Sequence, residues 1–139
     1  MKLLDTNIIL YAAGRPHQYK MACAKLVEEV ALGSTEYAVD TELLQEVLYV
    51  YASRGELARG LGAFDGLIRI LPNPIPIGRP EIVAARQLLE RYPALSPRDA
   101  IHAAVVQTQS LEGIVTTDRV FREVRGLATF DPRDLVSRA

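Results

Sequence analysis

The clearest signal of the fold is the stretch Lys2-Leu3-Leu4-Asp5-Thr6-Asn7-Ile8-Ile9-Leu10, close to the start of the chain. Its apolar beginning is short and stops at Asp5, and the residues that follow read as a helix closed by Gly14. We therefore predict a strand over residues 2–4, an acidic turn, and a helix over residues 6–13.

The same order of strand and helix recurs along the rest of the chain. Apolar periodicity and turn residues predict helices over about 17–32, 41–53, 56–71, 80–92 and 96–109, and strands over 36–39, 113–116 and 127–130. A brief strand at 75–77 and a short helix at 120–124 complete the pattern. Because strands that alternate with helices build mostly parallel sheets covered on both faces, we expect an α/β protein. Its three layers, α/β/α, would hold a central sheet of four to five strands.

The composition is that of an ordinary globular protein. The chain has 139 residues, of which 49% are hydrophobic and 24% are charged, with a mean hydropathy of +0.08. These values argue against a disordered, collagen-like or coiled-coil chain, and the length is typical of one domain, which we expect to span residues 1–139. The 16 basic and 17 acidic residues give a net charge of −1. Any nucleic acid would therefore have to bind at a local basic patch and not through the overall charge of the protein.

Cysteine and histidine are scarce. Cys23 is the only cysteine, so an intramolecular disulfide is impossible, and His17 and His102 alone make no dense set of zinc ligands. We expect a reducing cytoplasm and interpret Cys23 as a buried small side chain. No signal peptide is visible and no apolar run approaches the roughly 18 residues of a membrane span, so we expect no membrane partner.

Acidic residues mark the places where ligands collect in a parallel sheet. Asp5 and Asp118 each follow a predicted strand directly, at the carboxyl edge where the loops converge. An aspartate at a strand–helix boundary is also a good helix cap, and Ser96 with Asp99 has the pattern of a cap and first turn. Each acid alone therefore has a structural explanation.

The helix over residues 41–53 offers two glutamates, and the helical wheel separates them. Glu42 lies nearly opposite the apolar stripe of this helix, so we expect its charge to be solvated. Glu46 lies at the border of the stripe, from which a carboxylate can reach a half-buried groove. Glu46 is therefore the better site candidate.

Four carboxylates in one place would require a cation. At contact distance Asp5, Glu46, Asp99 and Asp118 cannot all be ionised without a compensating charge, and oxygen ligands favour Mg²⁺ or Mn²⁺. Such ions can orient water for attack on a phosphodiester. Without these four carboxylates, the net charge of the rest of the chain is +3. The basic residues that could attract a polyanion are Arg15, Lys20, Arg54, Arg98, Arg119 and Arg122.

Four segments in a fixed order resemble a known family. They are LLDTNIIL at 3–10, LQEVL at 44–48, SPRDAIHAA at 96–104 and IVTTDRVF at 114–121, followed by GLATFDP at 126–132. Together they resemble the PIN-domain ribonucleases, and more narrowly the VapC-type toxins of type II toxin–antitoxin pairs. The resemblance covers nearly the whole chain.

The resemblance implies a function and a set of site residues. It implies endonucleolytic cleavage of RNA at a Mg²⁺ or Mn²⁺ site built from Asp5, Glu46, Asp99 and Asp118, with supporting roles for Thr6, Asn7, Thr116 and Thr117. It also implies a small cognate antitoxin and a homodimer. Asp40 departs from the family, which more often has a small hydroxyl residue there. We interpret Asp40 as a helix cap and leave open whether it joins the metal network.

Other interpretations differ in their chemistry. A glycine pattern at Gly60, Gly62 and Gly66 superficially suggests a dinucleotide loop, but it lies inside a predicted helix and does not follow a strand. An aspartyl phosphatase would need a second acid at Asn7. The remaining alternatives are a catalytically inactive PIN-like module that binds RNA or protein, and a housekeeping PIN nuclease. We expect His102 to have a packing or surface role rather than to contact substrate.

Overall fold

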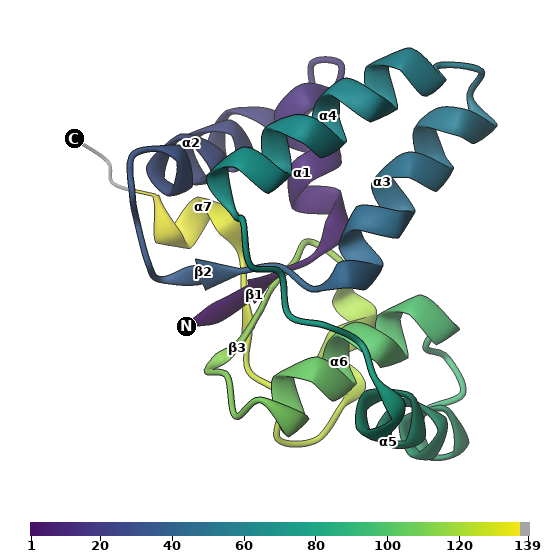
Figure 1. The fold of residues 1–139 in the computed structure, drawn as a ribbon. Helices are drawn as coiled ribbons and strands as arrows, with labels where there is room; N and C mark the ends of the chain where they lie inside the picture. Colours follow the sequence, from purple (N-terminus) through teal and green to yellow (C-terminus); the bar gives the residue numbers. More distant parts are fainter. Residues whose placement is uncertain (137–139) are drawn as a thin grey trace.

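A parallel sheet lies between two layers of helices in the computed structural model, which describes residues 1–136 (Figure 1). The strands are β1 (Lys2–Leu4), β2 (Tyr37–Ala38), β3 (Gly113–Val115) and β4 (Thr129–Phe130). Their order across the sheet is β2-β1-β3-β4, and every pairing among these four strands is parallel. The predicted α/β architecture is confirmed.

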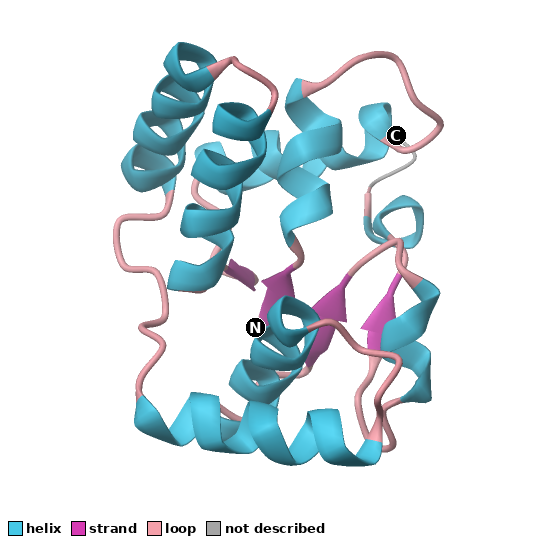
Figure 2. Cartoon of the chain, turned by 90° about the vertical axis from the view of Figure 1, so that its right-hand side faces the viewer, coloured by secondary structure: helices cyan, strands magenta, loops and turns pink. Residues whose placement is uncertain are grey.

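Helices cover both faces of the sheet, as the view along its edge shows (Figure 2). They are α1 (Thr6–Ala13), α2 (Lys20–Ala31), α3 (Thr41–Ser53), α4 (Leu57–Ile70), α5 (Arg79–Arg91), α6 (Pro97–Thr108) and α7 (Pro132–Leu135), with a 3₁₀ helix, η1 (Arg119–Glu123). The first four helices lie on one side of the sheet, and α5 and α6 lie on the other (Figure 1).

Alternation along the strands produces two separate cores. Successive strand residues point to opposite faces, so Leu3 and Ile114 are buried against α5 and α6. Leu4 and Val115 are buried against the other layer, with side chains from α1 to α4. Strands buried on both faces explain why these segments are continuously apolar.

The central pairing sets the position of the acidic turns. β1 runs beside β3 with Leu4 opposite Val115, and the Asp5 backbone N–H donates to the Val115 carbonyl oxygen at 3.0 Å. Asp5 therefore leaves the sheet next to Thr116, at the same edge. Residues 111 positions apart in the chain become neighbours through this register.

Several boundaries differ from the predictions. The strand expected at 75–77 is a single parallel bridge between Asp40 and Ile75, in a segment where alternate prolines remove the donors that a longer ladder needs. The helix expected near 120–124 is the 3₁₀ helix η1, and α2 begins only at Lys20. The short helix α7 was not predicted.

Cys23 is fully buried in the core, as predicted. Burial raises the pKa of its thiol to about 12, which suits a packing residue and not a nucleophile. Within residues 1–136, no helix combines the length and apolar character needed to cross a membrane.

Two glycines of α4 should respond oppositely to substitution by alanine. A Cβ at Gly60 would lie 2.7 Å from the Tyr51 Cβ of α3, whereas a Cβ at Gly62 would have nothing within 4 Å. We expect Gly60→Ala to lower the free energy of unfolding by about 1–3 kcal/mol through overpacking. Gly62→Ala should raise it by about 0.5–1 kcal/mol through helix propensity. Urea unfolding of both variants would test this, and equal effects would contradict the packing of α4 on α3.

Candidate active site

Asp5 is buried at the carboxyl end of β1, with hydrogen bonds to both carboxylate oxygens. The Thr6 backbone N–H donates to Oδ1 at 2.8 Å, and the Thr116 hydroxyl donates to Oδ2 at 2.8 Å. The same Thr116 oxygen accepts from the Asp118 backbone N–H at 3.0 Å. Asp5 is thus a helix cap, and it is also held in place by the strand end that carries Asp118.

The environment of Asp5 disfavours its charge. Burial, with smaller contributions from the nearby carboxylates of Asp99 and Glu46, raises the pKa of the Asp5 carboxyl to about 6. The charge of His102 and the hydroxyl of Thr116 act in the opposite direction without cancelling the rise. Asp5 therefore lies in a region of excess negative charge.

Asp99 and Asp118 extend this region from α6 and from the turn after β3. Asp99 lies in the first turn of α6, where the Ser96 hydroxyl oxygen caps its backbone N–H at 3.1 Å, as the sequence predicted. Burial, followed by repulsion from Asp118 and Glu46, raises the pKa of Asp99. Asp118 is exposed, and its Oδ1 caps η1 by accepting from the Val120 N–H at 3.0 Å.

Glu46 reaches the same region from α3, where it is buried. His102 is hydrogen-bonded to its Oε1 at 3.1 Å. Burial alone would raise the pKa of Glu46, but the hydrogen bond and charge of His102 outweigh burial and lower it. Asp5, Glu46, Asp99 and Asp118, which we call the acidic cluster, thus influence one another electrostatically from four separate elements.

Glu42 departs from the sequence interpretation. The helical wheel predicted a solvated charge, but Glu42 is partly buried, and burial followed by the charge of Glu46 raises its pKa. The prediction failed because α3 packs near α6, whose residues a wheel of α3 alone does not include.

The sequence analysis did not predict the buried contacts of His102 with two carboxylates. It is fully buried, its Nδ1 lies 2.7 Å from Asp40 Oδ2, and its Nε2 lies 3.1 Å from Glu46 Oε1 and 3.3 Å from the Thr6 hydroxyl oxygen. Burial opposes a charged imidazole, but the hydrogen bonds to Asp40 and Glu46 raise the pKa of His102 well above its usual range. Both ring nitrogens of His102 thus face carboxylate oxygens, an arrangement that favours the charged form of the ring. The sequence signal for a position near the site was the spacing of His102 from Asp99, three residues or about one turn of the same helix.

Asp40 caps a helix as predicted and also has a second role. Its Oδ1 accepts from the Leu43 N–H at 2.9 Å at the start of α3, while Oδ2 holds His102. Asp40 is connected to the acidic cluster only through His102. In its charged form His102 is an internal cation, which lowers the pKa of both Asp5 and Glu46.

The remaining predicted residues lie around the cluster. Asn7 is half-buried in the first turn of α1 and borders a pocket, and Thr117 borders a second pocket together with Asp118. Among the predicted cations, Lys20 donates to the Gly14 carbonyl oxygen at 2.6 Å, and the Arg98 guanidinium lies 4.4 Å from the Tyr49 ring centroid. The other four, Arg15, Arg54, Arg119 and Arg122, line the two pockets.

The chemistry of the acidic cluster suits a hard divalent cation, because every donor is a carboxylate oxygen and its members repel one another. As placed, no three His, Cys, Asp or Glu side chains among residues 1–136 are arranged to hold a metal ion. Glu46 faces His102 and Asp118 caps η1. Mutual repulsion accounts for carboxylates that gather without converging.

Comparison with known proteins identifies the family. The family model described as PIN domain matches residues 2–127. The chain belongs to the PIN domain family. It is 33% identical over 127 residues to ribonuclease VapC13 of Mycobacterium tuberculosis, in an alignment that covers 91% of this chain and 97% of that protein.

Solved structures have the same PIN fold. A toxin–antitoxin complex from Klebsiella pneumoniae superposes with a TM-score of 0.65 and 22% identity, covering 95% of this chain and 98% of that one. The VapBC2 complex from Rickettsia felis, bound to a promoter DNA fragment, gives a TM-score of 0.71 and 19% identity, covering 93% and 96%. These likenesses support the three-layer fold.

Removing the Asp5 charge should stabilise the metal-free protein. The rise of the pKa from 3.8 to about 6 corresponds to a cost on the order of 1–3 kcal/mol for ionising Asp5 in the fold at pH 7. In EDTA we expect Asp5→Asn to raise the free energy of unfolding by about that amount at pH 7. Because the folded-state pKa lies above the unfolded one, the gain should vanish below about pH 4, where both states are protonated. Urea unfolding across this range measures the gain, with the exposed Asp65→Asn as control; a loss of stability at pH 7 would contradict it.

Removing His102 should have the opposite effect. His102→Ala leaves the buried carboxylates of Asp40 and Glu46 without their cation, so we expect a loss of about 3–5 kcal/mol of unfolding free energy. The exposed His17 is the matched control, and His17→Ala should cost less than about 1 kcal/mol. Similar losses in the two variants would show that the buried ion pairs do not stabilise the fold.

Proposed function

We propose that this chain is a Mg²⁺- or Mn²⁺-dependent endoribonuclease and the toxin of a toxin–antitoxin pair. The observation that carries the proposal is the burial of Asp5 beside the repelling carboxylates of Asp99 and Glu46. A fold that only needed helix caps would not gather two further acids near a buried carboxylate. The name of the M. tuberculosis relative, a ribonuclease, supports the same activity.

The proposed site residues divide into ligands and supports. The acidic cluster, Asp5, Glu46, Asp99 and Asp118, would hold the metal, which would stabilise charge on a phosphodiester and promote ionisation of the attacking water. Thr116 fixes the Asp5 carboxylate, and the Thr6 backbone N–H fixes its other oxygen. The proposed supporting residues Asn7 and Thr117 would orient water at the rim.

His102 acts as a positioning residue in this proposal. Its two nitrogens connect Asp40, the cap residue of α3, with Glu46, six residues further along the chain and nearly two turns into the same helix. One Glu46 oxygen is thereby held in place. Second-shell partners of this kind orient a metal ligand before the metal binds.

The proposed partners follow from the compared structures. The K. pneumoniae neighbour is a toxin–antitoxin complex, and the R. felis neighbour is a VapBC2 complex on DNA, so we propose a small antitoxin for this chain. A homodimer and a single domain over residues 1–139 remain predictions. The cytoplasm, where RNA is available and a lone thiol stays reduced, is the proposed location.

Metal-dependent cleavage tests the proposal. The purified chain should cleave single-stranded RNA with Mg²⁺ or Mn²⁺, lose this activity in EDTA, and regain it when Mn²⁺ is restored. Asp5→Ala and Asp99→Ala should each reduce the cleavage rate at least about 100-fold because each removes a metal ligand. Sequencing the RNA ends gives the substrate in the same experiment.

The control is Asp65→Ala, which removes an exposed acid of α4 outside the acidic cluster. It should cleave at the wild-type rate, and circular dichroism should show all variants folded. Equal cleavage by wild type and Asp5→Ala would remove the catalytic assignment. Cleavage without growth arrest on expression would favour a housekeeping PIN nuclease.

A further inference from the structure

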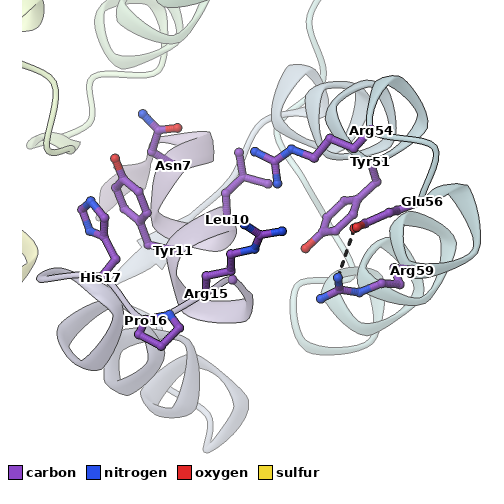
Figure 3. A pocket seen from close by; sticks show the side chains of 11 residues that line it. Asn7, Leu10, Tyr11, Arg15, Pro16, His17, Tyr51, Arg54, Glu56 and Arg59 are labelled. Atoms are coloured by element: carbon purple, nitrogen blue, oxygen red, sulfur yellow. Dashed lines mark hydrogen bonds and ion pairs between the residues drawn. The ribbon is translucent and has the colours of Figure 1, made fainter.

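A pocket of about 550 Å³ extends along α1, from its first turn to the segment that follows the helix (Figure 3). Its walls come from α1, the segment that follows α1, the end of α3 and the start of α4. Asn7, two residues after Asp5, lies on its border. One end of the pocket therefore lies close to Asp5 along the chain, and the rest extends towards the end of α1.

Positive charge dominates the walls of this pocket. Arg15, Arg54 and Arg59 line it, and its one carboxylate, Glu56, already pairs with Arg59 at 3.0 Å. Arg15 and Arg54 approach its interior from opposite walls (Figure 3). Within the described part of the chain, no carboxylate forms an ion pair with either of them. Two guanidinium groups are thus free to bind an anion.

Aromatic rings lie beside these cations. The rings of Tyr11 and His17 stack with centroids 4.4 Å apart and planes 7° from parallel. Tyr19 lies 5.9 Å from Tyr11 and 5.5 Å from His17. Because His17 is exposed, the stack is accessible to a flat ligand at its outer side.

The aromatic rings connect this pocket to a second one. Tyr19 also borders a pocket of about 190 Å³ that contains Asp118, Arg119 and Arg122. The two basic pockets are therefore joined through Tyr11, His17 and Tyr19, with Asn7 at one end of the path and Asp118 at the other. The two ends of this path are thus near the acidic cluster, since Asn7 follows Asp5 by two residues and Asp118 is itself a member.

We propose that the pocket beside α1 binds single-stranded RNA next to the cleavage point. Phosphates would pair with Arg15 and Arg54, and a base would stack on the Tyr11–His17 pair. Aromatic platforms combined with cations are typical of sites for single strands, since a duplex keeps its base faces covered. The inference rests on the proposed ribonuclease function and assigns the residues that would hold its RNA.

Fluorescence anisotropy with a labelled RNA of about 12 nucleotides, in EDTA to prevent cleavage, tests the proposal. The double variant with Arg15→Ala and Arg54→Ala should bind at least about tenfold more weakly. Its affinity should also depend less steeply on salt, by about 1 to 1.5 in the slope of log K against log salt concentration. His17→Ala should weaken binding about tenfold without changing that slope. A duplex of the same sequence should bind more weakly than the single strand.

The matched control is Arg79→Ala, which removes an exposed arginine at the start of α5, in the layer on the other side of the sheet. Its RNA affinity should equal that of wild type. Wild-type affinity in the Arg15 and Arg54 double variant, or equal binding of duplex and single strand, would overturn the proposal. A double variant that keeps RNA affinity but no longer co-purifies with its antitoxin would assign the pocket to a protein instead.

Cleavage by the wild type with Mn²⁺ is measured separately on the same RNA. If the wild type cleaves this RNA and the variants bind it as tightly as the wild type does, the pocket assignment is refuted and the ribonuclease proposal stands. Absence of cleavage would refute the ribonuclease proposal, while the anisotropy comparison would still decide whether the pocket binds RNA.

Discussion

The parallel pairing of β1 with β3 is the constraint on which the rest of the site depends. With Leu4 opposite Val115, both strands end at one edge, and Asp5 lies within hydrogen-bonding distance of Thr116. The two cores fix this register, because a slip by one residue would exchange the faces of Leu3 and Leu4. Carboxylates far apart in the chain therefore meet in the folded protein.

Gathering acids at this edge costs stability, and the structure offsets part of that cost internally. The charge of His102, held between Asp40 and Glu46, lowers the pKa of both Glu46 and Asp5. The compensation is incomplete, since the pKa of Asp5 still rises to about 6 and that of Asp99 also rises. A site that remains too negative after its internal cation is counted is suited to bind an external one.

The alternating order of elements and the strand-end acids could be predicted from the sequence because both depend on local pattern. The caps made by Asp5 and by Ser96 follow from the same local rules. The buried contact of His102 with Asp40 could not be predicted, since it joins residues 62 apart through the packing of α6 near α3. Glu42 was misjudged for the same reason. Periodicity shows which face of a helix is apolar, but it does not show which neighbour will cover the rest.

A crystal soaked with Mn²⁺ tests the central claim most directly, because its anomalous scattering locates the ion without reference to activity. The account predicts an anomalous difference peak among the carboxylate oxygens of Asp5 and Asp99, with Glu46 or Asp118 completing the protein ligands. The same soak of the Asp5→Asn variant should show a weaker peak or none. A well-ordered wild-type crystal with no manganese at this edge of the sheet, or with manganese bound only elsewhere, would contradict it.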